Sequence, residues 1–253
     1  MPQKRIDRVL EIIKQQGYVT VKYLCDELHY STATINRDLN DLQQQKLIVR
    51  RYGGAEYVVR KGTPLVFRYH QMRPVKRLIS QTAAQMIEDG MRIFIDGSTT
   101  AHYIGECIKD KQNITVITNN MNLVAHLSER GIRCICLGGQ VYEPPYMTGG
   151  LEAAMQAETY TADLCFFSTG GMSSNGEIYD SDGYLPVHRA MLARSEKCVL
   201  LIDHEKIDNW RVRVLGDLSV VDTIITDYEF SQAVHDKFPN TEFITVQTPK
   251  SQL

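Results

Sequence analysis

Hydrophobic residues near the N-terminus recur with a helical period. Over residues 31–42, Ile35, Leu39 and Leu42 lie at positions i, i+4 and i+7, which predicts one apolar face of a helix. Ser31 precedes this run and can cap the first turn, because a serine hydroxyl accepts a hydrogen bond from an otherwise unpaired backbone N–H group. The pattern therefore predicts a capped amphipathic helix.

Two further helices are predicted upstream of it. Residues 21–28 follow Thr20, a good capping residue, and residues 6–16 repeat apolar side chains with the same period. His29 and Tyr30 then form the short turn before the helix at 31–42. Two helices joined by a tight turn are typical of a helix-turn-helix, in which the second helix enters the major groove of DNA.

The face opposite the apolar stripe of residues 31–42 carries short or forked side chains. These are Thr32, Thr34, Asn36 and Arg37. Such groups hydrogen-bond base edges and phosphates. An ordinary surface helix would show the same cap and stripe, so this stretch alone leaves both alternatives open.

The next stretch, residues 46–58, alternates apolar and polar positions on both sides of a glycine pair, Gly53-Gly54. This predicts a β-hairpin with basic residues, a wing beside the helices. We expect Arg37 and Asn36 to face the major groove and the wing to contact the backbone or the minor groove. The residues predicted to bind DNA are Ser31, Thr32, Thr34, Asn36, Arg37, Arg50, Arg51 and Tyr52.

Helical and strand periods are both lost over residues 60–74, where we place a linker. The chain then alternates helix-like and strand-like runs, which predicts a mostly parallel α/β domain. The domains expected are therefore 1–59, the linker 60–74, and 75–253. The predicted strands are 91–95, 114–117, 133–137, 164–167, 198–202, 223–226 and 242–246. The first predicted helix carries inward residues from Val75 to Ile87 and ends at Asp89-Gly90, and the others are 100–108, 121–130, 152–160, 186–195 and 231–238.

Polar, glycine-rich segments follow several of these strands, where ligands bind in parallel α/β sheets. The first is Asp96-Gly97-Ser98-Thr99-Thr100. Hydroxyls, backbone N–H groups and a helix N-terminus would converge there, which favours an anion, most simply phosphate. Comparable segments are 118–120, 138–140, 168–171 and 203–206. Each alone could be a tight strand-to-helix turn, but their collection at one edge favours a ligand site.

Composition and charge support this prediction but do not change it. The chain has 253 residues, 43% hydrophobic and 23% charged, which is typical of a globular protein, and we expect a cytoplasmic location without a membrane segment. Residues 1–60 carry a net charge of +3 and the remainder −5, which supports DNA contact through the N-terminal part alone. The six cysteines are expected to be buried, reduced thiols, and no metal or cofactor is expected.

Combined motifs in the N-terminal part resemble the winged helix of the DeoR family of bacterial transcription regulators. They are Ser31-x-x-Thr34-Ile35-x-Arg37-Asp38-Leu39, Leu47-Ile48-x-Arg50 and Gly53-Gly54-Ala55. The chain departs from the family's usual residues at Tyr30, Asn36 and Tyr52, where valine, arginine and histidine are common.

The second part is similar to the sensor domain of the same family, whose fold is like that of ribose-5-phosphate isomerase and which binds phosphorylated sugars. The matching residues are Asp96-Gly97-x-Thr99-Thr100, Thr118-Asn119, Gly138-Gly139, Asp203-His204-x-Lys206 and Gly216-Asp217. The resemblance implies that Ser98, Thr99 and Thr100 hold the phosphate, that Asn119, Asn120 and Gly139 line the sugar, and that Lys206 adds positive charge. Relatives commonly have Glu and Lys where this chain has Tyr184 and His188.

Three functions fit all or part of this pattern. A repressor that binds operator DNA as a homo-oligomer, a dimer or tetramer, and senses a sugar phosphate accounts for both parts of the chain. An isomerase accounts only for the second part and needs an acid/base pair, whereas residues 168–172 hold no carboxylate. A DNA-bridging protein accounts only for the first. The prediction is therefore a non-enzymatic regulator. Its expected effector-binding residues are Asp96, Gly97, Ser98, Thr99, Thr100, Thr118, Asn119, Asn120, Gly138, Gly139, Gly170 and Lys206.

Overall fold

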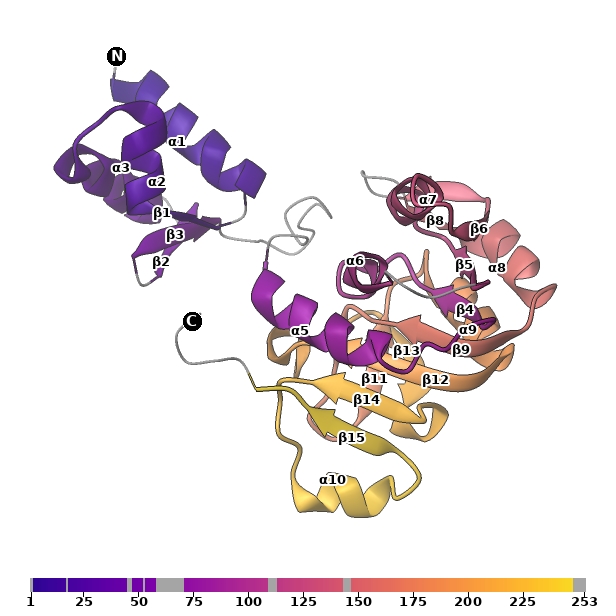
Figure 1. The fold of residues 1–253 in the computed structure, drawn as a ribbon. Helices are drawn as coiled ribbons and strands as arrows, with labels where there is room; N and C mark the ends of the chain where they lie inside the picture. The colour runs from indigo at the N-terminus through magenta and orange to yellow at the C-terminus, as the bar shows by residue number, and fades with distance from the viewer. Residues whose placement is uncertain are drawn as a thin grey trace. The chain divides into compact units, whose positions relative to one another are not determined.

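The computed structural model describes residues 2–16, 18–44, 47–51, 53–57, 71–108, 113–142 and 147–247 (Figure 1). The chain divides into two compact units, Met1–Arg73 and Pro74–Leu253. Most of the predicted linker, 60–74, lies outside the described residues. The two units are taken in turn.

The first unit contains the predicted helix-turn-helix. The helices are α1 (Pro2–Gln16), α2 (Val21–Leu28) and α3 (Thr32–Gln44). Thr20 caps α2 by accepting a hydrogen bond from the Tyr23 backbone N–H group at 3.1 Å. His29 ends α2 in the left-handed conformation, with φ 56°. Ser31 caps α3 through the Thr34 N–H group at 3.3 Å, so both predicted caps are confirmed.

The wing is also present, as strands β2 (Ile48–Arg51) and β3 (Gly54–Tyr57) paired antiparallel. A third strand, β1 (Tyr18–Thr20), pairs with the other edge of β3 and was not predicted. Its three residues are too few for a period to be read from the sequence. The residues buried beneath the wing and helices are apolar and include Val9, Ile13, Leu24, Ile35, Leu39, Leu42 and Ile48.

The second unit is built on a seven-stranded sheet in which every neighbouring pair is parallel. All seven predicted strands are found in it. They are β4 (Arg92–Ile95), β5 (Thr115–Thr118), β6 (Arg133–Cys136), β9 (Ala162–Phe167), β12 (Ser195–Ile202), β14 (Thr223–Thr226) and β15 (Glu242–Thr245). The order is β15-β14-β12-β9-β4-β5-β6, which places β4 and β9 near the middle. Residues on both faces of β4, β9 and β14 are buried, which explains their nearly continuous apolar sequences.

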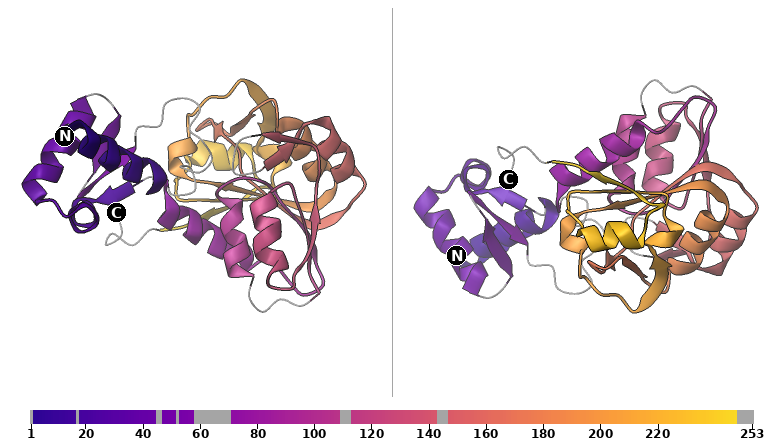
Figure 2. Two further views of the ribbon diagram at one scale, coloured as in Figure 1. Left: turned by 90° about the horizontal axis from the view of Figure 1, so that it is seen from above. Right: turned by 90° about the horizontal axis from the view of Figure 1, so that it is seen from below.

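Helices cover both faces of this sheet (Figure 2). One group is α5 (Arg73–Ala84), α6 (Ile104–Cys107) and α7 (Met121–Ser128). The other is α8 (Gly150–Glu158), α9 (Leu185–Ala193) and α10 (Gln232–Lys237), which share one apolar core with the sheet. Short 3-10 turns are η1 (Ala101–Tyr103), η2 (His204–Lys206) and η3 (Leu218–Val220). The helix expected over 100–108 is thus only η1 followed by one α-helical turn.

Two small strand groups lie outside the predictions. β7 (Gln140–Tyr142) pairs antiparallel with β8 (Met147–Gly149). β10 (Gly171–Met172), β11 (Glu177–Asp180) and β13 (Arg213–Asp217) form a second sheet. These strands span two to five residues, so tertiary pairing rather than local pattern decides them.

The cysteines are only partly as expected. All six are free thiols, and Cys165 and Cys198 are buried, but Cys136 is exposed and the other three are half-buried. Cys136 lies at the end of β6, the edge strand of the sheet, so no further strand covers it. Among the described helices, none is both long and apolar enough to span a membrane.

Candidate functional site

The exposed side of α3 carries part of the predicted DNA-binding set. Ser31, Thr32 and Arg37 are exposed, and Thr34 is half-buried with its hydroxyl 3.0 Å from that of Ser31. The hydroxyls of Ser31 and Thr34 are therefore hydrogen-bonded to each other at the start of the helix. Arg37 is the long cationic side chain of α3 that extends into solvent, as a base-reading or phosphate-binding group must.

The wing contributes Arg50, whose guanidinium lies on α3. Its Nη2 donates to Asn36 Oδ1 at 2.7 Å and its Nη1 to Asn40 Oδ1 at 3.1 Å. Asn36 and Arg50 are predicted to contact different parts of the DNA, but in the structure their side chains are hydrogen-bonded to each other. Arg51 pairs with Glu56 across the hairpin at 2.9 Å, and Tyr52 lies outside the part of the chain that the structure describes.

Asp38 of α3 has a structural position instead. Its side chain is 1% exposed and accepts two hydrogen bonds from Arg5 of α1, at 2.6 and 2.7 Å. A bidentate arginine–carboxylate pair fixes both distance and orientation. Asp38 therefore holds α1 against α3, which positions the exposed face of α3.

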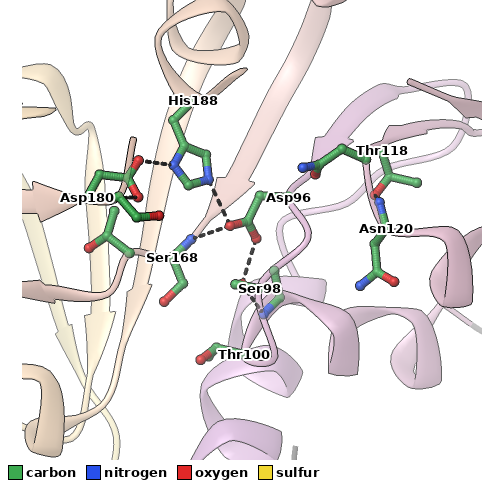
Figure 3. A network of polar contacts seen from close by, with 12 residues as sticks. Asp96, Ser98, Thr100, Thr118, Asn120, Ser168, Asp180 and His188 are labelled. Atoms are coloured by element: carbon green, nitrogen blue, oxygen red, sulfur yellow. Dashed lines mark hydrogen bonds and ion pairs between the residues drawn. The ribbon is translucent and has the colours of Figure 1, made fainter. Parts of the chain in front are cut away.

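The second unit has a cluster of buried polar residues at the carboxyl ends of its central strands (Figure 3). Each member is at most 5% exposed. The members are Asp96, Thr99, Thr100, Thr118, Asn119, Asn120, Ser168, Thr169, Asp180, His188 and Asp203. Because buried polar groups are costly unless paired, such a cluster away from the apolar core has to be explained by its hydrogen bonds or by a ligand.

Asp96, directly after β4, organises the cluster through both carboxylate oxygens. Oδ1 accepts from the Ser98 hydroxyl at 2.6 Å, and Oδ2 accepts from the Ser168 N–H group at 3.2 Å and lies 3.0 Å from His188 Nε2. Ser98 also accepts from the Ala101 N–H group at 3.1 Å. Asp96 and Ser98 thus shape the loop and hold it against β9.

His188 of α9 lies between two carboxylates, as Figure 3 shows. Its Nδ1 is 2.6 Å from Asp180 Oδ2, and its Nε2 faces Asp96. Burial lowers the pKa of this imidazole, but the charges and hydrogen bonds of Asp180 and Asp96 outweigh it and raise the pKa from 6.5 to about 10. A cation therefore stands between the two acids. From the sequence, His188 stands out only as a departure from relatives and Asp180 is not predicted, since no local pattern links the two residues.

Two lysines reach the hydroxyls of the loop after β4. Lys76 Nζ of α5 donates to Thr99 Oγ1 at 3.2 Å, and Lys206 Nζ of η2 lies 3.4 Å from Thr100 Oγ1 and 2.8 Å from Ser168 Oγ. Lys206 was predicted. Lys76 was missed, because a lysine in an amphipathic helix ordinarily indicates the solvent-facing side, whereas this one is 3% exposed.

Asn119 and Asp203 have acceptor atoms without a hydrogen bond. Asn119 donates through Nδ2 to the Thr148 carbonyl at 2.7 Å, but its Oδ1 is buried and has no hydrogen-bond partner. Asp203 Oδ2 is also without a hydrogen bond and lies 3.9 Å from Lys206 Nζ. Unsatisfied buried acceptors are uncommon and suit a ligand that supplies hydroxyl donors.

Other residues predicted to bind the effector instead form hydrogen bonds with nearby backbone groups or are closely packed. Thr118 Oγ1 accepts from the Asn120 N–H group at 3.0 Å, and Asn120 Oδ1 caps α7 through the Leu123 N–H group at 3.0 Å. The glycines are close-packed. A Cβ would collide with Met147 at Gly97, with the Gly149 carbonyl at Gly139 and with Arg211 at Gly170, and the Gly138 N–H group donates to Gln156 at 2.9 Å.

The site therefore combines two ammonium groups, hydroxyls and unpaired acceptors. This combination suits an anion that also carries hydroxyl groups. Within the described residues, no group of three or more His, Cys, Asp and Glu side chains could hold a metal ion.

Comparison with known proteins decides the family. Residues 5–61 match the profile described as "DeoR-like helix-turn-helix domain", and residues 72–228 match "DeoR C terminal sensor domain". The chain belongs to the DeoR family. As a DeoR-family protein it is a DNA-binding transcriptional regulator, and its predicted winged helix-turn-helix and parallel α/β architecture is confirmed.

Several DeoR-family relatives match over most of their length. The "Glycerol-3-phosphate regulon repressor" of Escherichia coli is 30% identical over 88% of this chain and 90% of its own. The "HTH-type transcriptional repressor GlcR" of Bacillus subtilis is 30% identical over 92% of each chain. The "L-fucose operon activator" of Escherichia coli is 31% identical over 90% and 96%. A solved ribose 5-phosphate isomerase of Plasmodium falciparum aligns over 52% of each chain with 14% identity and a TM-score of 0.39. This similarity is too low to assign an activity to the chain.

Proposed function

We propose that this DeoR-family protein represses an operon of sugar metabolism and is released from its operator when the second unit binds a phosphorylated sugar. The observation that carries the proposal is the buried arrangement around the loop after β4, where Lys76 and Lys206 approach neighbouring threonine hydroxyls. A phosphate would accept hydrogen bonds from both ammonium groups and from the hydroxyls.

The sugar portion has candidate partners beside the phosphate. Asn119 Oδ1 lies at the end of β5, the strand next to β4, and lacks a hydrogen bond. A hydroxyl of the effector would satisfy it, which removes the cost of a buried unpaired acceptor. A free anion such as sulfate has no donor for this atom, so we expect phosphate esters of polyols to bind better than inorganic anions.

The names of two relatives, a glycerol-3-phosphate regulon repressor and an L-fucose operon activator, support regulation of a sugar or polyol-phosphate operon. The relatives include both repressors and an activator. We propose repression, relieved by the effector. The protein would act in the cytoplasm, where operator DNA is found, as a homo-oligomer that places two heads on paired half-sites.

An enzymatic role is less well supported by the geometry. A general base needs a carboxylate free to accept a substrate proton. Both oxygens of Asp96 already accept hydrogen bonds, and His188 has a carboxylate at each ring nitrogen. Asp203 Oδ2 has no hydrogen bond, but it lies 3.9 Å from the Lys206 ammonium, and neither Asp96 nor His188 is free to act with it as the second member of an acid/base pair. We therefore propose that the bound sugar phosphate is sensed without turnover.

The test is the double substitution Thr99→Ala and Thr100→Ala in the full-length protein. Operator affinity is titrated against glucose 6-phosphate, fructose 1-phosphate, ribose 5-phosphate and glycerol 3-phosphate, with each unphosphorylated parent as a control. The operator is a duplex selected by the wild type from random DNA. The wild type should lose operator affinity with at least one ester, and the double variant should bind DNA normally but no longer respond.

A matched control is the double substitution Thr159→Ala and Thr161→Ala. These two exposed threonines precede β9, at the amino ends of the parallel strands and away from the polar cluster at their carboxyl ends. This variant should respond like the wild type. The proposal is wrong if free sugars act as well as their phosphates, or if the Thr99 and Thr100 double variant still releases DNA normally.

A further inference from the structure

The exposed apolar side chains of the second unit are concentrated around α8 and β13. Apart from Met121 of α7, every exposed large apolar side chain that the structure describes in this unit belongs to β7, α8, β13, η3 or the segment before β13. These side chains are Val141, Leu151, Met155, Trp210, Val212, Val214 and Val220. Single exposed apolar residues are ordinary, whereas a collection of them marks an interaction surface.

Helix α8 presents one half of this surface. Leu151, Met155 and Glu158 lie at positions i, i+4 and i+7, so they form one stripe along the helix. Leu151 and Met155 are 69% and 67% exposed, while the alanines on the opposite side are buried. Glu152 and Glu158 are the charged residues of α8, which contains no lysine or arginine. This half is therefore apolar and acidic.

Residues 211–214, which lead into β13, present the other half. Their sequence is Arg-Val-Arg-Val, and all four are exposed. Val212 is 87% exposed, more than any other large apolar side chain that the structure describes. Arg189 of α9 adds a third arginine, because its Nη2 donates to the Val214 carbonyl at 3.4 Å. This half is therefore apolar and basic.

The two halves are complementary, and they lie on one unit. Helix α9 contacts both α8 and β13, so it separates the acidic half from the basic half. If α8 of one copy lies on residues 211–214 of a second copy, two-fold symmetry produces the same contact a second time. Arg213 already pairs with Asp182 at 2.9 Å, but both side chains are more than half exposed, so this surface pair contributes little and competes weakly. A different protein would need to match both halves at once, which a second copy does by symmetry.

We infer that a second copy of this chain docks on this face, with α8 of each subunit against residues 211–214 of the other. The inference names the surface of the homo-oligomer in the proposed function and rests on that part of it. Apolar contact supplies most of the free energy of association, and the glutamates and arginines set the orientation. Because the face belongs to the second unit, the assembly would carry two DNA-binding units, as paired half-sites require.

The first measurement is the mass of the full-length protein in solution, without operator or effector. Met155→Lys places a cation opposite Arg213 of the partner subunit, and Val212→Asp places an anion opposite Glu158 of the partner subunit. The wild type should sediment as a dimer or tetramer at micromolar concentration. Each variant should sediment at half the wild-type mass, with association weakened about 100-fold or more.

The control for this measurement is Met121→Lys. It makes the same replacement at an exposed methionine of α7, 40% exposed and away from α8 and β13, and it should sediment as the wild type does. Met155 and Val212 are exposed, so their variants should fold normally, which circular dichroism checks. A monomeric wild type, or wild-type mass in both Met155→Lys and Val212→Asp, would overturn the inference.

The second measurement mixes the two variants and tests which segments meet. In a mixed dimer of Met155→Lys with Val212→Asp, one contact sets the introduced lysine against the introduced aspartate, and the other contact is wild type. The mixture should therefore regain the wild-type mass, although neither variant has it alone. A mixture of Met155→Lys with Leu151→Lys is the control and should stay at half mass, because both of its contacts carry an added lysine. Failure of the first mixture to recover would overturn the contact between α8 and residues 211–214.

The outcomes separate this inference from the sensing function. If the mixture regains the wild-type mass but no phosphate ester changes operator affinity, the proposed release is wrong and the interface stands. If an ester releases the operator but Met155→Lys and Val212→Asp associate as the wild type does, the interface is wrong and the sensing function stands.

Discussion

Replacing His188 tests whether the cation between Asp96 and Asp180 holds the second unit together. His188→Gln leaves two buried carboxylates facing a neutral side chain. Removing one partner of a buried ion pair costs about 3–5 kcal/mol. The rise in the histidine pKa from 6.5 to about 10 corresponds to a free energy of the same order, about 5 kcal/mol. For a unit of this size, the melting temperature should fall by roughly 6–20 °C.

The pH dependence of this effect has a definite sign. A folded-state pKa above the unfolded value means that the folded unit binds the proton more tightly. The stabilisation by His188 is therefore complete below about pH 6.5 and is lost as the pH rises through about 10. The difference in stability between the wild type and His188→Gln should shrink over that interval.

Urea unfolding monitored by Trp210 fluorescence measures the effect, because the single tryptophan lies in the second unit and reports on it alone. His188→Lys restores a cation between the two acids and should lose less stability than His188→Gln. Adding Asp180→Asn to His188→Gln should recover part of the loss, since one unpaired charge is removed. A cost of under about 1 kcal/mol at pH 7, or a cost that does not diminish toward pH 10, would refute the reasoning.

The remaining predictions concern the first unit and assembly. Arg37→Ala should weaken operator binding by about 1–3 kcal/mol if Arg37 contacts a base, measured by operator titration, and unchanged affinity in a folded variant would exclude that contact. Asn36→Ala should lower operator affinity partly by freeing Arg50, so that its effect and that of Arg50→Ala are not additive in a double-mutant cycle. Asp38→Asn should lower the melting temperature of the first unit by several degrees, because it weakens the pair with Arg5, while sensor-unit melting stays unchanged. Sedimentation should show an oligomer at micromolar concentration, and a monomer that still protects a single half-site would contradict paired heads.

Local pattern was sufficient for much of the fold. The caps at Thr20 and Ser31 depend on neighbouring residues, and the structure shows both. The seven strands of the main sheet were predicted because parallel strands buried on both faces are nearly continuous apolar runs. The predictions were incomplete or wrong for segments that are short or that depend on pairing with distant strands. These segments are β1, the two small strand groups and the helix after Thr100, which is shorter than predicted.

Residues within a few positions of one another are enough to predict the domain types, the succession of main strands and helices along the chain, and the polar loops that follow the strands. The use of those polar groups depends on contacts between distant parts of the chain. In the tertiary structure, Asp96 and His188, 92 residues apart, form one buried network with Asp180, and Lys76 points inward to Thr99. These contacts join separate strands and helices, and no local period records which distant side chains meet when the sheet assembles.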